Sequence, residues 1–365
     1  MAGRRHDIVL AGGGLAGGLI AMALQQQRPD LSVLLVEGTD RLGGHRRHTW
    51  IGKAADAMAF DRFRMARWQA ADFAFPDRAR HLAMEVFSIS ADDFDAGLRR
   101  NLPPGSIRAH AAIEQVRGNG LLLQSGEEIA ARTVIDCRGF ARSEALDLGW
   151  RTSMERRLAS ADLHGVQTPM VLDAGGEQGG VFAFAQVLPT GVDELVVGEH
   201  RLSRRSLIDR RELSCAIEAT CSRAGWQGDI LGSEASVTPL IAGGSLNAHY
   251  AELGMPGVPI AGSRGLFIHP LTGSSMASAL DLARAIAAEA DLPGDQLAAM
   301  LADRARKHWR AMQAPRRLAS RLLAAQGRGA QLAGRLAGLP EGTIMRLLAG
   351  KAGMTDRVRL ALARG

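Results

Sequence analysis

The chain has few cysteines, few aromatic residues and no long apolar run. Its 365 residues include three cysteines, Cys137, Cys215 and Cys221, which are scattered along the sequence. This number and spacing exclude a disulfide framework and favour a reducing compartment. Because no apolar run approaches the ~20 residues that cross a bilayer, we expect no transmembrane helix. The chain is 46% hydrophobic and 22% charged, which is typical of a globular protein and argues against gross disorder.

The sequence also has no metal-binding motif and no convincing secretion signal. No cluster of cysteine and histidine has metal-ligand spacing, so we expect no metal site. We interpret His45 and His48 as part of a solvated loop, because no further ligand pair accompanies them. Residues 1–23 resemble a secretory signal, but their many glycines argue against an apolar signal helix, and we do not expect export.

Negative charge is scarce at the C-terminal end. Residues 303–365 hold fourteen Lys and Arg against three Asp and Glu, a net charge of +11, whereas the whole chain carries +6. This asymmetry indicates an anionic partner. We expect no nucleic acid, because few aromatic residues and no nucleic-acid motif accompany the charges. Arginines alternating with apolar residues at helical spacing favour an anionic membrane surface, and a solvated helical bundle is the alternative.

The strongest motif occupies residues 6–37. An apolar run at 8–11 leads into three glycines at the Gly-x-Gly-x-x-Gly spacing, namely Gly12, Gly14 and Gly17. An amphipathic segment and a second apolar run follow, and Glu37 closes the second run twenty residues after Gly17. This order predicts a strand, a tight turn, a helix and a second strand that together bind a dinucleotide. The helix N-terminus would face the pyrophosphate, and Glu37 would accept hydrogen bonds from a ribose.

Three further segments are candidates for contact with the same cofactor. Arg41 and Gly43 follow the acid, in a loop that runs along the cofactor in many flavoproteins. A buried-type strand ends in Asp136 and Gly139, where we expect contact with the adenosine half. Near the end of the chain, we expect a short strand that ends at Gly262 and, after a turn, an amphipathic helix that starts near Ser274 or Ser275. This helix offers a second N-terminus to an anion or a flavin carbonyl. The candidates in this turn are Pro270, Thr272, Gly273 and Ser274.

The pattern as a whole predicts an α/β fold of glutathione-reductase type. Its FAD-binding, Rossmann-like domain would comprise residues 1–50, 95–150 and 255–292. Short strands with Gly and Pro punctuation, around 170–173, 181–188 and 194–199, predict an inserted antiparallel sheet. We assign 51–94 and 151–254 to this substrate domain and 293–365 to a basic helical C-terminal region. A front glycine motif combined with a rear strand, turn and helix indicates FAD rather than NAD alone.

These residues resemble the bacterial lycopene beta-cyclases, flavoproteins that close the rings of carotenoids. The resemblance covers nearly the whole chain. Its carriers are residues 7–37, HTW at 48–50, FPDRARHL at 75–82, VIDCRG at 134–139, HGVQTPMVLDA at 164–174, LPTGVDELVVGEH at 188–200, HPLTG at 269–273 and the segment 339–362.

The resemblance implies a reaction without net redox change, run on reduced FAD with NADPH as reductant. An acid would protonate an acyclic polyene, the ring would close through a carbocation, and a neighbouring proton would leave. Such a substrate dissolves in membranes, so the resemblance implies a cytoplasmic protein peripheral to the inner membrane. The alternative is an FAD-dependent monooxygenase or other oxidoreductase that acts on an apolar substrate.

The chain departs from the family on the substrate side. The segment 197–200 typically reads apolar-Glu-Asp-Thr, and its acids are the proposed catalytic groups. Here Gly198 replaces the first acid and Glu199 stands at the second. We therefore predict that Glu199 is the acid, with His200 or Asp173 as second choices.

Overall fold

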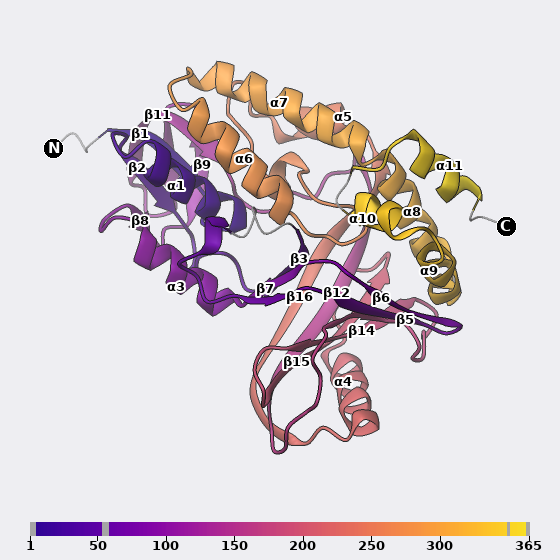
Figure 1. Cartoon of the computed structure of the whole chain (residues 1–365). Helices are drawn as coiled ribbons and strands as arrows, with labels where there is room; N and C mark the ends of the chain where they lie inside the picture. The colour runs from indigo at the N-terminus through magenta and orange to yellow at the C-terminus, as the bar shows by residue number, and fades with distance from the viewer. Residues whose placement is uncertain (1–4, 53–57, 349–350, 363–365) are drawn as a thin grey trace.

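The computed structural model describes residues 5–52, 58–348 and 351–362, whose strands form three sheets (Figure 1). The six-stranded sheet has the order β8-β2-β1-β11-β10-β9. Its core is parallel, because β1 pairs with β2 on one side and β11 on the other. Its strands are β1 (His6–Ala11), β2 (Val33–Val36), β8 (Ile107–Arg108), β9 (Ile113–Arg117), β10 (Gly120–Leu123) and β11 (Glu128–Asp136).

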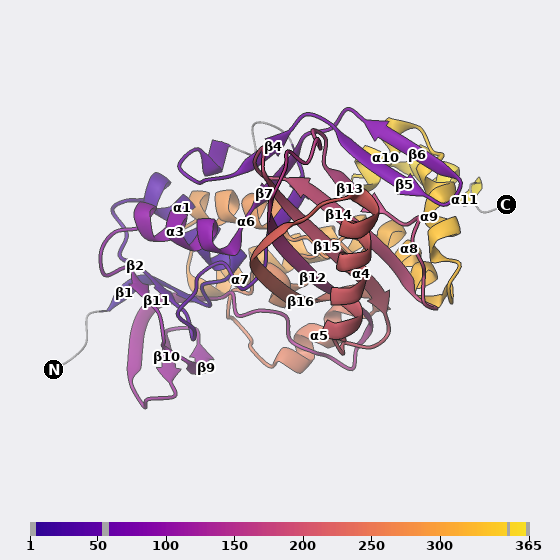
Figure 2. The same ribbon diagram turned by 90° about the horizontal axis from the view of Figure 1, so that it is seen from below.

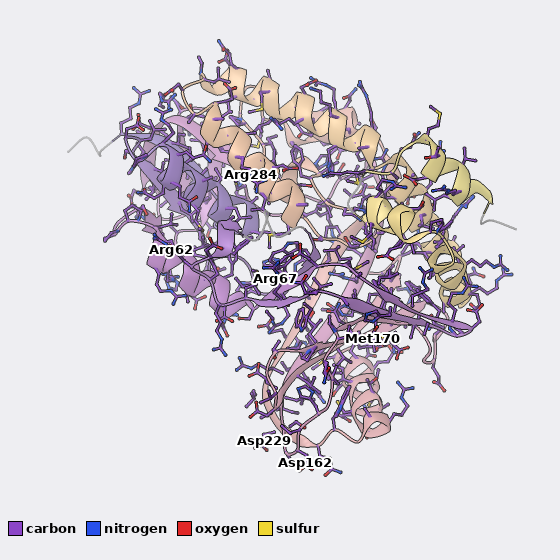
Figure 3. The ribbon with its side chains drawn as sticks, in the orientation of Figure 1. Arg62, Arg67, Asp162, Met170, Asp229 and Arg284 are labelled. Carbon is purple, nitrogen blue, oxygen red and sulfur yellow. The ribbon has the colours of Figure 1, made fainter. Side chains whose placement is uncertain are left out.

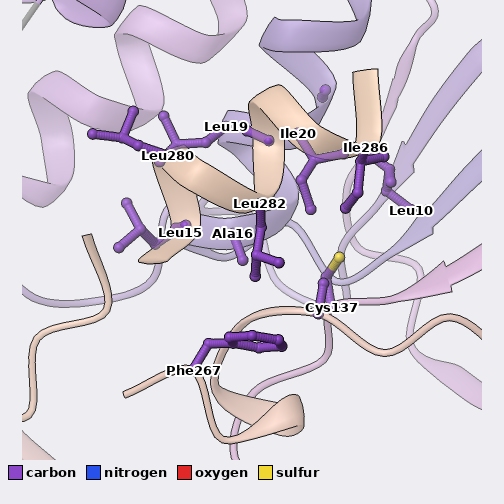
Figure 4. Close-up of a cluster of buried hydrophobic side chains, with 14 of the residues drawn as sticks. Leu10, Leu15, Ala16, Leu19, Ile20, Cys137, Phe267, Leu280, Leu282 and Ile286 are labelled. Carbon is purple, nitrogen blue, oxygen red and sulfur yellow. The ribbon is translucent and has the colours of Figure 1, made fainter. Parts of the chain in front are cut away.

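Helices α1 (Leu15–Gln27) and α6 (Met276–Ala288) pack together against the parallel strands. Their apolar residues form one buried cluster with the sheet and with Phe267, which lies after η2 (Gly262–Gly265) (Figure 4). The predicted strand before Gly262 is wrong, since the chain makes only an isolated bridge at Ile260 before turning into η2. The two helices that begin at the predicted cofactor turns therefore share one core.

The seven-stranded sheet has the order β16-β12-β15-β14-β13-β5-β6, and all its pairs are antiparallel except β13 with β5. Its strands are β5 (Ala71–Phe75), β6 (Arg78–Leu82), β12 (Leu146–Ser160), β13 (Met170–Asp173), β14 (Phe182–Pro189), β15 (Glu194–Ser203) and β16 (Gly228–Gly244). The three predicted strands are present as β13, β14 and β15. The prediction missed the two longest strands, β12 and β16, which run together to a tip marked by Asp162 and Asp229 (Figure 3).

Each face of this sheet has its own cover. Helix α4 (Arg210–Ala224) lies across β12, β14 and β15 (Figure 2), and its Leu213 and Ile217 pack on Val197. On the opposite face, Leu240 packs against helix α8 (Gln313–Ala324), and a Cβ added to Gly149 would lie 2.2 Å from Leu323 of that helix. We call these two sides the α4 face and the α8 face.

A small sheet and several aromatic side chains lie between the two large sheets. It contains β3 (His48–Ile51), β4 (Ala66–Trp68) and β7 (Val86–Ile89), with η1 (Met58–Phe60) and α3 (Ala91–Asn101) nearby in sequence. Trp50 stacks on Phe87 with their ring centroids 5.4 Å apart, and both are buried. The interpretation of His48 as part of a solvated loop is wrong. Its ring is buried and its Nε2 bonds to the Gly43 carbonyl at 2.9 Å.

The C-terminal part is helical, as predicted. It contains α7 (Gly294–Ala311), α8, α9 (Gly329–Ala337), α10 (Glu341–Leu348) and α11 (Met354–Leu362), whereas the short helix α5 (Leu246–Leu253) precedes η2. The apolar residues between the arginines belong largely to the core, because Leu318, Leu322 and Leu347 are buried. Among the described residues, no helix combines the length and apolarity that a bilayer crossing needs.

Candidate active site

The glycine turn after β1 is required by the packing of the chain itself. Gly12 has φ +107°, and a Cβ there would lie 2.8 Å from the backbone of Arg138. A Cβ on Gly17 would lie 2.0 Å from the carbonyl oxygen of Gly12. Gly14 differs, since a Cβ there would meet no atom within 4 Å. Gly12 therefore lets the turn lie against the chain that follows β11, Gly17 lets α1 pack closely on the turn, and Gly14 leaves the helix N-terminus open.

Helix α1 begins without a capping side chain and without an acid in its first turn. Its first N–H groups and its positive dipole end are thus available to an anion. The carboxylate of Glu37 accepts the Gly13 N–H at 2.8 Å, the Thr39 N–H at 2.9 Å and the Thr39 hydroxyl at 3.1 Å. Because a carboxylate offers about four acceptor sites, Glu37 keeps capacity for about one more hydrogen bond.

The loop after Glu37 closes onto the glycine turn. Gly43 has φ +80°, its N–H donates to the Gly13 carbonyl at 2.7 Å, and a Cβ there would lie 2.2 Å from Phe94. Arg41 is half-buried and pairs with Asp92 at 2.7 Å. The structure thus places Gly43 beside the turn, whereas the side chain of Arg41 binds to α3.

Asp136 is fully buried at the end of β11 and is bound by two arginines. Its carboxylate accepts from the Arg138 guanidinium at 2.9–3.0 Å and pairs with Arg264 Nε at 2.8 Å. Gly139 is exposed, and a Cβ there would meet no atom within 4 Å. Asp136 therefore joins β11 to the segment before α6.

The turn before α6 forms a second open helix start. The N–H of Gly273 donates to the His269 carbonyl at 2.8 Å, and the His269 N–H donates to the Ser274 carbonyl at 2.8 Å. Thr272 Oγ1 accepts the Ser274 N–H at 3.2 Å, and Pro270 is buried within the turn. The N-cap residue Ser275 of α6 makes no side-chain cap bond, Ser274 Oγ accepts the Met276 N–H at 3.4 Å, and the first turn holds no acid. These groups leave the α6 N-terminus without an internal anion.

Two arginines outside this turn hold its carbonyl groups. Arg151 Nη1 on β12 donates to the Thr272 carbonyl at 2.7 Å. Arg46 donates to Thr238 Oγ1 at 2.9 Å and to the Gly273 carbonyl at 3.4 Å. The α8 face of the seven-stranded sheet is therefore the side that lies toward the N-terminus of α6.

The structure separates the predicted catalytic residues. Neighbouring residues of a strand point to opposite faces, so Glu199 and His200 lie on different sides of the sheet. Glu199 shares the α4 face with Val197 and lies 3.9 Å from Arg201 Nε. Asp173 is paired across β14 to the same side, and its Oδ1 accepts the Gly175 N–H at 2.9 Å. The structure thus brings Glu199 and Asp173 to one face and His200 to the other.

His200 is buried and lacks polar partners. Its ring stacks on Phe184 with centroids 4.8 Å apart, and neither ring nitrogen has a hydrogen-bond partner within the described structure. Burial lowers the pKa of His200 well below its ordinary value, and the nearby Arg151 lowers it further. His200 is therefore a neutral imidazole on the α8 face.

Burial raises the pKa of Glu199 to about 7, against the opposing effect of Arg201. The folded protein consequently binds this proton more tightly than the unfolded chain, whose carboxyl has a pKa near 4.5. Stability therefore falls as pH rises from 4.5 to 7. We expect Glu199→Gln to raise the free energy of unfolding at pH 8 by up to about 3 kcal/mol, and by much less at pH 5. Urea unfolding at both pH values measures this, and an equal effect at the two would contradict it.

The family can be assigned from the sequence as a whole. The profile of the family described as "Lycopene cyclase protein" matches residues 7–364. The chain belongs to the lycopene cyclase family. It is 32% identical over 364 residues to a lycopene beta-cyclase of Pseudescherichia vulneris, covering 97% of this chain and 93% of the relative. It is 31% identical to a lycopene beta-cyclase of a Paracoccus species, covering 97% and 93%.

Solved structures confirm the predicted fold class for this lycopene cyclase family member. A geranylgeranyl bacteriochlorophyll reductase-like protein from Thermoplasma acidophilum superimposes with a TM-score of 0.62 at 15% identity, covering 98% of this chain and 96% of that protein. A flavin-dependent halogenase from Xanthomonas campestris gives 0.61 at 13%, covering 97% and 92%. At this identity the comparison establishes the fold alone.

Several polar residues near His200 were not among the predicted site residues. In the register of the sheet, Glu155 on β12 lies directly between Gly198 on β15 and Glu234 on β16. Arg47 reaches the same place from the chain before β3, with its Nε 3.8 Å from Glu155. The alternation along β12 puts Arg151 and Glu155 on one face, but their neighbours depend on the register of three strands. Local sequence therefore offered no direct signal for this cluster.

Proposed function

We propose that this protein closes beta-ionone-type rings on a linear polyene of the lycopene class. The observation that carries the proposal is the family match over residues 7–364, together with relatives named lycopene beta-cyclase that are aligned over 97% of the chain. The reaction is an intramolecular isomerisation. A proton adds to a terminal double bond, the next double bond attacks the resulting cation, and a neighbouring C–H loses its proton. Atoms and electrons balance without an external oxidant.

The chain has the residues that an FAD would need. Two helix N-termini begin without an internal anion, at α1 and at α6. A Cβ on Gly14 meets no atom within 4 Å, so the backbone there is open to close approach. We propose that FAD is held by the predicted set, which is Gly12, Gly14, Gly17, Glu37, Arg41, Gly43, Asp136, Gly139, Pro270, Thr272, Gly273 and Ser274. In its reduced form, with NADPH as the reductant, bound FAD supplies negative charge that stabilises a substrate cation.

The protein contributes orientation and the exclusion of water. Asp136 orients Arg138 and Arg264 through its buried carboxylate and so connects the two halves of the proposed FAD site. Arg46 and Arg151 hold the carbonyl groups before α6. His200 is neutral and dry, as a site that must protect a carbocation from water requires. We propose the domain division 1–50, 95–150 and 255–292 for FAD, 51–94 and 151–254 for substrate, and 293–365 for the C-terminal region.

Ring closure is tested by expression in cells that accumulate lycopene, with chromatography of the extracted pigment. We expect ring-closed carotenoid and a flavin in the purified protein. A protein that holds FAD but yields no ring-closed product would overturn the proposal. Measurements of NADPH and oxygen separate a cyclase from a monooxygenase. A cyclase needs reductant only in catalytic amount, whereas a monooxygenase consumes NADPH and oxygen with each turnover.

We further propose that the protein lies on the cytoplasmic side of the inner membrane as a peripheral protein. Four exposed arginines of the C-terminal helices and their connections are the candidates for contact with anionic lipid: Arg317, Arg321, Arg328 and Arg335. Because the neighbouring leucines are largely packed in the core, binding would rest on charge. Each basic group near an anionic surface contributes about 1 kcal/mol.

Reversal of these four charges to glutamate is expected to lower binding to vesicles that contain phosphatidylglycerol by at least tenfold, as measured by co-sedimentation. Wild-type binding should also fall as salt rises, since screening weakens it. The matched control is reversal of four exposed arginines on α4 or just before it, namely Arg205, Arg210, Arg211 and Arg223. Equal losses in both variants would contradict a specific role for the C-terminal arginines.

A further inference from the structure

Two carboxylates lie side by side on the α8 face. Glu155 and Glu234 are directly paired across β12 and β16, so their side chains leave the sheet on the same side. The Cβ atoms of such a pair are about 5 Å apart. Like charges at this distance repel, and a partly buried pair of carboxylates therefore tends to keep one proton.

Charged groups from three elements face Glu155. Arg47 Nε lies 3.8 Å from its carboxylate, with side-chain exposures of 10% for the arginine and 18% for the glutamate. Arg46 and Arg151 are the other cations, and Glu234 is the other anion. Burial raises the pKa of Glu155, and the negative charge of Glu234 raises this pKa further. The three arginines lower it. The result is a pKa above the ordinary value despite three neighbouring cations.

The glycine on the next strand leaves room for this carboxylate. A Cβ on Gly198 would lie 3.0 Å from Cγ of Glu155 and 3.1 Å from Nε2 of His200. A larger side chain at 198 would compete with both groups for the same space. Gly198, Glu155 and His200 therefore form one packed unit, in which a carboxyl group adjoins a buried neutral imidazole without polar partners.

The carboxylate pair also lies on the side of the sheet that faces the α6 N-terminus. Arg151, four residues earlier on the same face of β12, donates to the Thr272 carbonyl. By the rise of a strand, Glu155 is roughly 13 Å further along. Glu199, in contrast, leaves β15 toward α4. Of these two glutamates, only Glu155 shares the face that carries the turn-binding arginines.

We propose that Glu155 is the proton donor for ring closure and that Glu234 is its partner. This inference rests on the proposed cyclase function. The O–H bond of the Glu155 carboxyl breaks as its proton forms a C–H bond at the terminal double bond, and the ring closes through the cation. A neighbouring C–H then returns its proton to the carboxylate, which restores the acid. The step consumes no reductant.

The test compares Glu155→Gln and Glu199→Gln in cells that accumulate lycopene and in purified FAD-loaded protein. Loss of a general acid costs typically 10²–10⁴-fold in rate. We expect Glu155→Gln to lose ring closure to this extent while it retains FAD and its melting temperature. Glu218→Gln is the control, since Glu218 is exposed and pairs with Arg156 on the α4 side. The opposite result, with Glu199→Gln inactive and Glu155→Gln active, would overturn the proposal.

A pH profile separates proton donation from a structural role. The protonated form of Glu155 is required, so activity falls as pH rises through its pKa. Glu234→Gln removes a like charge and lowers that pKa, and we expect the falling limb to move to lower pH. Glu155→Asp should retain part of the activity. If the falling limb of the pH–activity profile does not move in Glu234→Gln, the proposed coupling of Glu155 to Glu234 is contradicted. If wild type itself closes no ring, the proposed function fails, whereas an active Glu155→Gln overturns only the inference.

Discussion

Replacement of Gly17 by alanine is expected to abolish FAD retention and to lower the stability of the protein. The new Cβ would lie 2.0 Å from the Gly12 carbonyl oxygen. Gly12 cannot retreat, because its own Cβ position is 2.8 Å from the Arg138 backbone. Overpacking of this kind typically costs about 1–3 kcal/mol, and here it must shift α1 away from β1. Thermal unfolding measures the loss, and absorbance at the flavin band measures the retained cofactor.

Gly14→Ala is the matched control, because a Cβ there meets no atom within 4 Å and the backbone φ of −65° suits alanine. We expect its stability to stay within about 1 kcal/mol of wild type. Its affinity for FAD should still fall, since the methyl group occupies the open approach to the α1 N-terminus. Wild-type stability in Gly17→Ala would contradict the packing argument. Unchanged FAD affinity in Gly14→Ala would show that the cofactor does not approach at this residue.

Such paired variants can be designed because the first strand, turn and helix are determined locally. The apolar runs at 8–11 and 33–36, and the glycines between them, occur within one short segment of sequence. The structure has β1, α1 and β2 in these places, and two of the glycines pack as the motif requires. Helix α6 was likewise predicted to begin near Ser274 or Ser275, and in the structure it begins at Met276 with Ser275 at the N-cap position. Local patterns predicted these elements because the residues that determine each of them are close together in the sequence.

The long strands β12 and β16 were missed because tertiary pairing determines them. The second half of β12 reads Glu155-Arg156-Arg157, which breaks the apolar alternation expected of a half-buried strand. Its charges are instead matched by neighbouring elements. Arg156 bonds to Glu218 of α4 at 3.0 Å, and Glu155 faces Arg47. The sequence pattern of β12 alone does not predict those partners.

The candidate acid illustrates the same limit. Period-two alternation predicts that Glu199 and His200 lie on opposite faces, but it does not say which face meets the cofactor side. That depends on α4, which covers one face through Leu213 and Ile217, and on Arg151, which joins the other to Thr272. The catalytic role of Glu199 stays a prediction, and the comparison with Glu155 decides it.

Replacement of Asp136 by asparagine is expected to destabilise the protein by about 3–5 kcal/mol, the usual cost of removing one partner from a buried ion pair. Asp136 is 0% exposed, and the loss leaves Arg138 and Arg264 without their shared carboxylate. Native proteins have a free energy of unfolding of about 5–15 kcal/mol, so this loss would unfold a substantial fraction of the molecules at moderate temperature. The backbone of Asp136 also pairs with Ala11 of β1 in the sheet and forms a β-bridge with Ile260. The first elements to separate should therefore be β11 and the segment before α6.

Asp291→Asn is the control for Asp136→Asn, since Asp291 also pairs with an arginine, Arg28, at 2.7 Å but is 79% exposed. Exposed pairs contribute about 0–1 kcal/mol, so urea unfolding should separate the two variants clearly. Adding Arg264→Gln to Asp136→Asn should recover part of the loss, because it removes one of the two uncompensated cations. Equal stability of Asp136→Asn and Asp291→Asn would show that the buried carboxylate does not hold the β11 end in place.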